Sequence, residues 1–240
     1  MSTDVVRVYG LPPLWGCPSP SPFVIKVLTW LRIADVPNEL VHLTWFPRSK
    51  SGKIPYIDRP DGSVLSDSQR IIETLSAERG IDVGKDLSDA QRATSHLVRR
   101  TLEESAYFCG LYERFATPEG FAQVRVGYFR HFPWPIRVIA PLMVRRASLR
   151  NLWGQGMGRR PRAEVAQMAR ADIRAISGTL GSQRFMLGDE PHSVDASAFA
   201  FLWAMSSVPF ESALRSEIEA HENLRTYVTT CRAKWFPDAT

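Results

Sequence analysis

"IPYIDRPDGSVLSDSQRIIETLSAERG" occupies residues 54–80 and places two short apolar runs directly before a helical pattern. The two runs are joined by residues 59–62, whose Pro, Asp and Gly favour a tight turn, so we expect a β-hairpin. Ser66 or Asp67 can cap the following helix, and Gly80 can end it. This stretch therefore predicts a β-β-α unit.

The residues before this unit predict a β-α-β unit. "VVRVYG" (5–10) and "NELVHLTW" (38–45) are typical of strands, and Ser21–Ala34 predicts a helix between them. The helix has apolar side chains at helical spacing, namely Phe23, Val24, Val27, Leu28 and Leu31. Residues 1–82 are therefore expected to form one small α/β domain.

Beyond a linker at "IDVGKD" (81–86) the pattern is helical throughout. A buried stripe predicts a long helix from Asp89 to Tyr112, and "VDASAFAFLWAM" (194–205), apolar almost all round, predicts a central buried helix. Later helices are expected to be separated at prolines and glycines, namely Pro118, Pro133, Pro135, Pro141, Pro161, Gly154, Gly156 and Gly158. We therefore expect an α+β protein of two domains, residues 1–82 and an all-helical 87–240.

Composition excludes several classes of protein. The chain has 240 residues, a net charge of +5 and no apolar run of 18 residues, so we expect no membrane span. Its start lacks the pattern of a signal peptide. Three widely spaced cysteines argue against a disulfide framework or a metal site, and a cytoplasmic location fits them best. The most basic stretch, "GRRPR" (158–162), lacks the interleaved aromatics of a nucleic-acid site.

Five segments together resemble the glutathione transferase superfamily, and most closely its branch with metaxins, failed-axon-connections proteins and bacterial relatives. The resemblance covers nearly the whole chain and rests on the order and spacing of the segments. They are "SPFVIKVLTWLRIADV" (21–36), "GKIPYIDRPDGSVLSDSQRIIETL" (52–75), "VRRTLEESAYF" (98–108), "WGQGMGRRP" (153–161) and "MLGDEPHSVDASAFAF" (186–201). It implies a thioredoxin-like first domain and a helical second domain.

The resemblance also implies a reaction. Glutathione, as co-substrate, would lie along the first domain with its thiol near the N-terminus of the first helix. A hydrophobic electrophile, such as an epoxide or an activated halide, would bind against the helical domain. Because the thiolate is the nucleophile and a free thiol of pKa about 8.5 is mostly protonated at neutral pH, the site has to favour the anion.

Three residues before or at the first helix are candidates for activating that thiol. Ser21-Pro22-Phe23-Val24 matches the position of the Cys-Pro-aromatic-Cys motif of related proteins, with non-thiol residues at both cysteine positions. Ser21 is the first candidate, and as a simple helix cap it would contribute about 0.5–2 kcal/mol. Ser19 and Cys17 are the alternatives, and Cys17 could form a mixed disulfide with glutathione.

Two further segments are expected to bind glutathione by resemblance. Pro55 would follow a cis peptide bond that turns the backbone of Ile54 towards the cysteinyl part, and Lys53 could reach a carboxylate. Asp67 and Ser68 would open a helix that holds the γ-glutamyl end, since helix N-termini bind anions. The simpler interpretations are a strand-starting proline, a solvated lysine and a capped helix.

Aromatic side chains are candidates for the electrophile pocket, although aromatic residues are more often part of a core. They are Trp15, Trp45, Tyr107, Phe108, Phe129, His131 and Trp134. Two motifs are expected to be structural. Glu103 and Glu104 would pair with Arg99 or Arg100, and Asp195 would cap the buried helix, although His192 stands where the family has Ser or Thr.

The sequence thus favours a glutathione transferase that acts on a hydrophobic electrophile and can form a homodimer. A second interpretation is a non-catalytic binding or adaptor protein, since some metaxin-like relatives use the fold for assembly at membranes. A third is a glutathione-dependent thiol-disulfide reductase acting through Cys17, which the lack of cysteine at position 21 disfavours.

Overall fold

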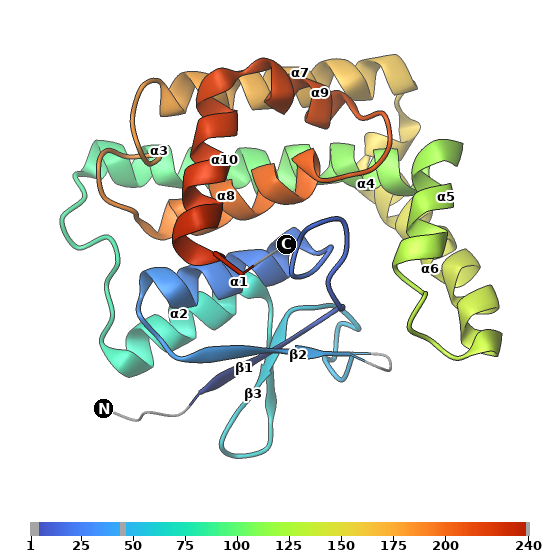
Figure 1. Cartoon of the computed structure of the whole chain (residues 1–240), viewed down its shortest axis with the longest axis horizontal. Helices are drawn as coiled ribbons and strands as arrows, with labels where there is room; N and C mark the ends of the chain where they lie inside the picture. The colour runs from blue at the N-terminus through green and yellow to red at the C-terminus, as the bar shows by residue number, and fades with distance from the viewer. Residues whose placement is uncertain (1–4, 44–46, 239–240) are drawn as a thin grey trace.

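The computed structural model describes residues 5–43 and 47–238. A four-stranded sheet forms its base, and helices are layered above it (Figure 1). The strands are β1 (Val6–Gly10), β2 (Asn38–His42), β3 (Tyr56–Asp58) and β4 (Val64–Ser66). Their order in the sheet is β2-β1-β3-β4, with β1 parallel to β2 and the other two pairs antiparallel. This is the predicted β-α-β and β-β-α arrangement.

Helices α1 (Pro22–Ile33) and α2 (Ser68–Arg79) connect this sheet to the rest of the molecule. The central side chains of α1 are buried on all sides because the helix packs on β1 and β2 and also on α8. The remaining α-helices are α3 (Asp89–Arg100), α4 (Tyr107–Phe115), α5 (Pro118–Gly127), α6 (Trp134–Gln155), α7 (Arg162–Leu180), α8 (Ser193–Ser206), α9 (Ala213–Ala220) and α10 (Glu222–Trp235). A short 3₁₀ turn, η2 (Met157–Arg159), follows α6.

The predicted long helix from Asp89 is continuous from α3 through α4, with one difference. Residues Thr101–Ala106 form a π-helical segment, η1, between α3 and α4. Single π turns are rare in proteins, and those that occur are often found at functional sites. In this chain the π segment contains Glu103, which is 8% exposed.

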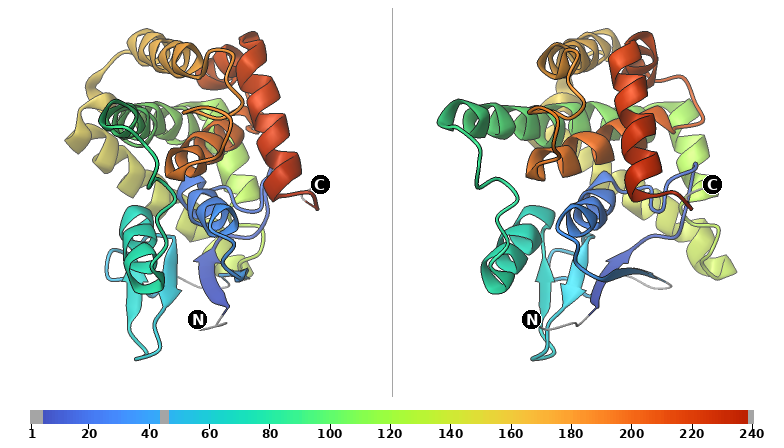
Figure 2. Two further views of the ribbon diagram at one scale, coloured as in Figure 1. Left: turned by 90° about the vertical axis from the view of Figure 1, so that its left-hand side faces the viewer. Right: turned by 60° about the vertical axis from the view of Figure 1, so that its left-hand side comes forward.

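Helix α8 is the predicted central helix. Every residue from Val194 to Met205 is buried, and one apolar core extends from β1 through α1 and α8 to α10. Figure 2 shows α8 enclosed between α1 and the outer helices. Asp195 has the predicted structural role: its Oδ2 accepts from the His192 amide, and its Oδ1 accepts from Met186 N and Tyr227 OH, all at 2.8 Å.

Helices α5 and α6 form a hairpin at one edge of the molecule, on the right in Figure 1. They share a small apolar cluster of their own with Phe115 and Phe129. Arg130 in their connection donates to the Pro13 carbonyl at 3.0 Å, so the hairpin touches the loop before α1. Pro141 lies inside α6 and does not separate two helices as expected, because the helix continues through it.

Within the described ranges, no helix is both long enough and apolar enough to cross a bilayer.

Candidate functional site

The start of α1 leaves a hydroxyl group uncommitted. Ser21 stands at the N-cap with extended backbone angles, and its carbonyl accepts from Val24 N at 3.1 Å and Ile25 N at 3.2 Å. In the described part of the chain, however, its side chain makes no capping hydrogen bond. Pro22 occupies the first turn, where a missing N–H costs nothing. The expected side-chain cap is therefore absent, and the Ser21 hydroxyl, half-buried, remains at the positive end of the helix.

Ser19 and Cys17 are less suitable for meeting a ligand. Ser19 is fully buried, and its Oγ is 3.5 Å from the Ser21 amide, which donates to it. Cys17 is 4% exposed and packs in the main core. Burial raises the pKa of its thiol to about 11, although Ser207 and Arg114 act in the opposite direction. A buried thiol of this pKa is almost entirely protonated at neutral pH, which does not fit a nucleophile.

The loop before β3 has the predicted backbone. The Ile54–Pro55 bond is cis, Pro55 is buried, and Ile54 is half-buried against the main core. Lys53 is exposed, and its carbonyl accepts from the Ser49 hydroxyl at 2.6 Å. The lysine side chain is thus free to extend into solvent beside this loop.

The start of α2 is capped by Asp67. One carboxylate oxygen, Oδ1, accepts from the amides of Gln69 and Arg70, both at 3.0 Å, so Asp67 and not Ser66 is the cap. Asp67 has a φ of 80°, a conformation that is costly for a residue with a Cβ and that concentrates at functional sites. Ser68 is the first helical residue and is 4% exposed.

A buried ion pair joins α1, α2 and the π segment. The Lys26 ammonium donates to Glu103 Oε1 at 2.6 Å and to Gln69 Oε1 at 2.9 Å. Ser197 on α8 also donates to Glu103 Oε1, at 2.8 Å. Burial lowers the pKa of Lys26, and Glu103 opposes that shift. The pair fixes the start of α2 relative to α1 and to the helical half.

Both predicted pairs are present, and Glu103 has in addition a closer partner. Glu104 pairs with Arg100 at 3.0 Å on the surface, as predicted. Glu103 is 3.8 Å from Arg99 and much closer to Lys26. The π segment contains Glu103 and directs it inward, which a regular helical pattern does not reveal.

A buried guanidinium lies beside the loop that precedes α1. Arg114 donates to the carbonyls of Pro20 at 3.3 Å and Ala204 at 3.0 Å, and its Nε has no partner among the described residues. It lies 5.8 Å from the Trp15 ring, and Trp15 in turn packs 5.5 Å from Tyr128. Burial raises the pKa of Tyr128, and the neighbouring Arg114 opposes that shift.

The candidate aromatic residues separate into several environments. Tyr107 packs edge-on against Phe23, 4.9 Å away, and Phe108 packs against Tyr107 at 5.3 Å. Burial raises the pKa of Tyr107, and the charge of Arg114 opposes that shift, so Tyr107 lies within electrostatic range of the same guanidinium as Trp15 and Tyr128. The other candidates do not join them. Phe129 is in the small hairpin cluster, His131 accepts from Arg130 on the surface, Trp134 is exposed on α6, and Trp45 lies outside the described residues.

Comparison with known proteins places this arrangement in a family. A glutathione S-transferase N-terminal domain model matches residues 22–120, and a glutathione S-transferase C-terminal domain model matches residues 169–231. An isoprene-epoxide–glutathione S-transferase of Rhodococcus sp. (strain AD45) is 32% identical over 96% of this chain and 99% of its own. The chain belongs to the glutathione S-transferase family.

Other relatives have different names. Metaxin-1 of Sus scrofa is 28% identical over 93% of this chain and 73% of its own length. Failed axon connections of Drosophila melanogaster is 28% identical over 98% of this chain, which spans 59% of that protein. This confirms the branch of the family that the sequence resembles.

Solved structures share the glutathione S-transferase fold. A Phanerochaete chrysosporium transferase, GSTFuA3, has a TM-score of 0.64 at 14% identity and covers 97% of this chain and 98% of its own. A Methylobacterium radiotolerans transferase in complex with glutathione sulfonate has a TM-score of 0.60 at 16% identity, covering 98% and 94%. At these identities the likeness concerns the fold.

Sequence reasoning missed three residues of this candidate site, namely Lys26, Arg114 and Tyr128. Lys26 could have been found, because it interrupts the apolar run at residues 23–28 and needs a buried partner. Arg114 follows Tyr107 by seven residues, on the same helical face. Tyr128 comes from the hairpin, and no local pattern indicates that it returns to the loop before α1.

Proposed function

We propose that this chain is an active transferase that joins the thiolate of glutathione to a hydrophobic electrophile of the epoxide or halide type. The proposal rests on the start of α1, where the Ser21 hydroxyl makes no capping bond within the described residues and lies at the positive helix end. The relative from Rhodococcus, at 32% identity, is named for an epoxide substrate.

Ser21 would act on the glutathione thiol. A hydroxyl that donates to the sulfur stabilises the thiolate more than the thiol, and the N-terminal amides of α1 add to this effect. Ser19 and Cys17 are not proposed for this role, because one is fully buried and the other is a buried, protonated thiol.

The binding of glutathione would use the two loops that flank β3 and β4. The backbone of Ile54 would pair with the cysteinyl part of the peptide as an added strand. The Ser68 amide and hydroxyl would hold the γ-glutamyl carboxylate at the start of α2. Asp67 uses Oδ1 for capping, which leaves Oδ2 for the γ-glutamyl ammonium. Lys53 would face the carboxylate at the other end.

The electrophile would lie beside Tyr107, Trp15 and Phe108. In the reaction of an epoxide, the sulfur forms a bond to carbon, the carbon–oxygen bond of the ring breaks, and the oxygen must gain a proton. Burial raises the pKa of Tyr107 and Tyr128, so both phenols are protonated at neutral pH and able to donate that proton. Water would then reprotonate the phenolate. Arg114, with its unpaired Nε, would favour the negative oxygen.

Two measurements test the proposal. Ser21→Ala should reduce conjugation of styrene oxide and 1-chloro-2,4-dinitrobenzene at pH 7 and shift the pH–rate profile to higher pH. The affinity for glutathione should change little. Ser19→Ala and Cys17→Ala are the parallel variants, and an effect confined to Cys17→Ala would contradict the assignment. Ser68→Ala should weaken glutathione binding about 10- to 100-fold by calorimetry, the cost of a hydrogen bond to a charged group. Ser66→Ala, outside the helix, is the matched control.

A non-catalytic binding protein is the second candidate. Ser68, which would bind the ligand, is only 4% exposed. An Arabidopsis thaliana relative, 24% identical over 97% of this chain, is named as a mitochondrial outer membrane import complex protein. Glutathione binding without turnover of any electrophile would favour this candidate, and lack of glutathione binding would remove the first one.

A further inference from the structure

The net positive charge of the protein is concentrated in the α5–α6 region and the turn that follows it. Residues 118–162 contain nine arginines, no lysine and one acidic residue, Glu119, a formal charge of +8. The rest of the chain has 21 basic and 24 acidic residues and is therefore at −3. Such an asymmetry between parts of one chain points to an anionic partner.

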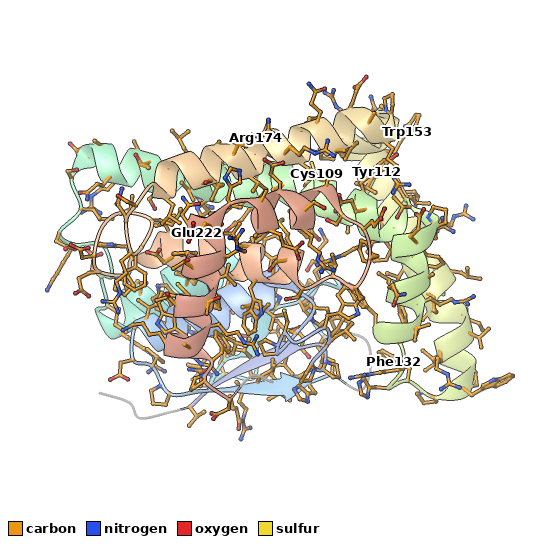
Figure 3. The ribbon with its side chains drawn as sticks, turned by 45° about the horizontal axis from the view of Figure 1, so that its top comes forward. Cys109, Tyr112, Phe132, Trp153, Arg174 and Glu222 are labelled. Carbon is orange, nitrogen blue, oxygen red and sulfur yellow. The ribbon has the colours of Figure 1, made fainter. Side chains whose placement is uncertain are left out.

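The outer face of α6 is apolar. Four side chains that share one side of the helix are well exposed, namely Val138 at 56%, Leu142 at 61%, Leu149 at 38% and Trp153 at 60%. Trp134, at the first turn, is 71% exposed. Figure 3 shows Trp153 at the outer edge of the molecule, on the same side as Phe132, which precedes the helix. Exposed apolar surface of this extent marks an interaction site.

Arginines border this apolar stripe. Arg146 and Arg150 are exposed beside Leu142 and Leu149, and they line a shallow hollow of about 480 Å³ with Trp153. Helix α6 contains no acidic residue. Two copies of the chain packed through this face would oppose arginine to arginine with nothing to neutralise them, so the charges disfavour a second copy as the occupant.

We propose that the outer face of α6 docks on an anionic lipid surface. Leu and Trp side chains enter the headgroup boundary, and the flanking arginines contact lipid phosphates, as in helices that lie in a membrane interface. The first part of α6 lies at the lower right edge of Figure 1, and exposed apolar side chains continue along the helix from Trp134 to Trp153. The start of α1 is not part of this face.

Vesicle sedimentation with the full chain tests the proposal. The protein should bind vesicles of phosphatidylcholine with 30% phosphatidylglycerol, and not vesicles of phosphatidylcholine alone. Binding should fall as salt rises, since salt screens exposed charges. Arg146→Glu/Arg150→Glu should lower the partition coefficient at least ~20-fold, because each basic residue near such a surface contributes about fivefold.

Matched variants separate the face from general charge and apolarity. Leu142→Asp should abolish binding, whereas Leu97→Asp, on α3 and equally exposed at 65%, should not. Arg170→Glu, exposed on α7, is the charge control. Equal binding to neutral vesicles, or binding that survives the α6 variants while circular dichroism shows native helix content, would overturn the proposal. So would the absence of vesicle binding, including a case in which Leu142→Asp instead dissociates a dimer in sedimentation equilibrium.

Discussion

Charged residues are arranged in opposite ways in two regions of the molecule. One region is the junction where α1 and α8 meet the π segment, and the other is the α5–α6 hairpin. At the junction, Lys26 is 1% exposed, and its ammonium donates hydrogen bonds to Glu103 and Gln69. In the hairpin, residues 118–155, six arginines accompany one glutamate, and apolar side chains of α6 are exposed. We infer that the buried ion pair at the junction fixes the geometry of the site, whereas the arginines of the hairpin are available to a partner.

Loss of one member of the buried pair should have the largest effect. Lys26→Met removes the closest cation from the buried Glu103 and leaves only Arg99, 3.8 Å away, so we expect a loss of about 3–5 kcal/mol in the free energy of unfolding. Urea denaturation followed by circular dichroism measures it. Arg100→Met removes a surface pair and should cost at most about 1 kcal/mol.

The double variant Lys26→Met/Glu103→Leu controls for the pair itself. Apolar replacement of a whole buried pair is often close to neutral, so most of the lost stability should return. If the double variant is as unstable as Lys26→Met alone, the destabilisation comes from packing and the charge interpretation is wrong.

Cysteine reactivity provides the next largest contrast, this time within the site. At pH 8 a thiol of pKa about 11, as for Cys17, has a thiolate fraction roughly 240-fold below that of an ordinary thiol of pKa about 8.5. Native protein should therefore react slowly with iodoacetamide, and the rate should rise about tenfold per pH unit between pH 7 and 9.5. Mass spectrometry of labelled peptides measures it.

Ser21→Cys is the matched variant for this prediction. A thiol at a helix N-terminus has a lowered pKa, so Cys at position 21 should be labelled much faster than Cys17 in the same molecule. Rapid labelling of Cys17 in the folded wild-type protein would restore it as a candidate for thiol chemistry.

Arg114 and Arg145 offer a comparison between buried arginines at the site and in the hairpin. Arg114→Met removes donors from two carbonyls, Pro20 and Ala204, and should cost about 2–3 kcal/mol. Arg145 is half-buried and donates to one carbonyl, Phe115, at 3.0 Å, so Arg145→Met should cost about 1 kcal/mol. Equal costs, measured by urea denaturation, would remove this distinction between the two regions.

The sequence predicts local structure well and long-range partners poorly. The β3–β4 hairpin, α2 and α8 follow from turn residues and periodicity. The structural role of Asp195 follows from its place at the start of α8. The Lys26–Glu103 pair joins residues 77 apart, and the π segment that directs Glu103 inward has no period of its own. Pro141 was expected to end a helix, yet α6 continues because burial of Ala140, Ser148 and Leu152 stabilises it on both sides.

At the candidate site, the sequence predicted which residues stand at helix starts, but not which side chains are buried. Ser21, Asp67 and Ser68 stand at helix starts as predicted, because caps and prolines are local features. Burial of Ser19 and Cys17 depends on how the loop packs against Arg114 and α8, which no local pattern indicates. The roles of these residues towards glutathione stay predictions.

His192 gives a smaller effect with the opposite sign. Asp195 accepts from the His192 amide, but His192 Nδ1 is buried and without a partner among the described residues. His192→Thr would supply a hydroxyl for the Asp195 amide and complete a capping box, so we expect a gain of about 1 kcal/mol. Thermal unfolding measures it. His192→Val, of similar shape without a hydroxyl, should not reproduce the gain.

The smallest effect should be found on the outer face of α6. Leu142 is 61% exposed, so Leu142→Ala should change the free energy of unfolding by no more than about 0.5 kcal/mol. Leu152, on the same helix, is fully buried in the main core, and Leu152→Ala should cost about 2–4 kcal/mol. Urea denaturation of the isolated protein, in the absence of lipid, measures both changes in the free energy of unfolding. A large loss for Leu142→Ala would mean that the stripe is covered by part of this protein in solution. It would then contribute to the fold, and the contrast between a closed junction and an open hairpin would no longer hold.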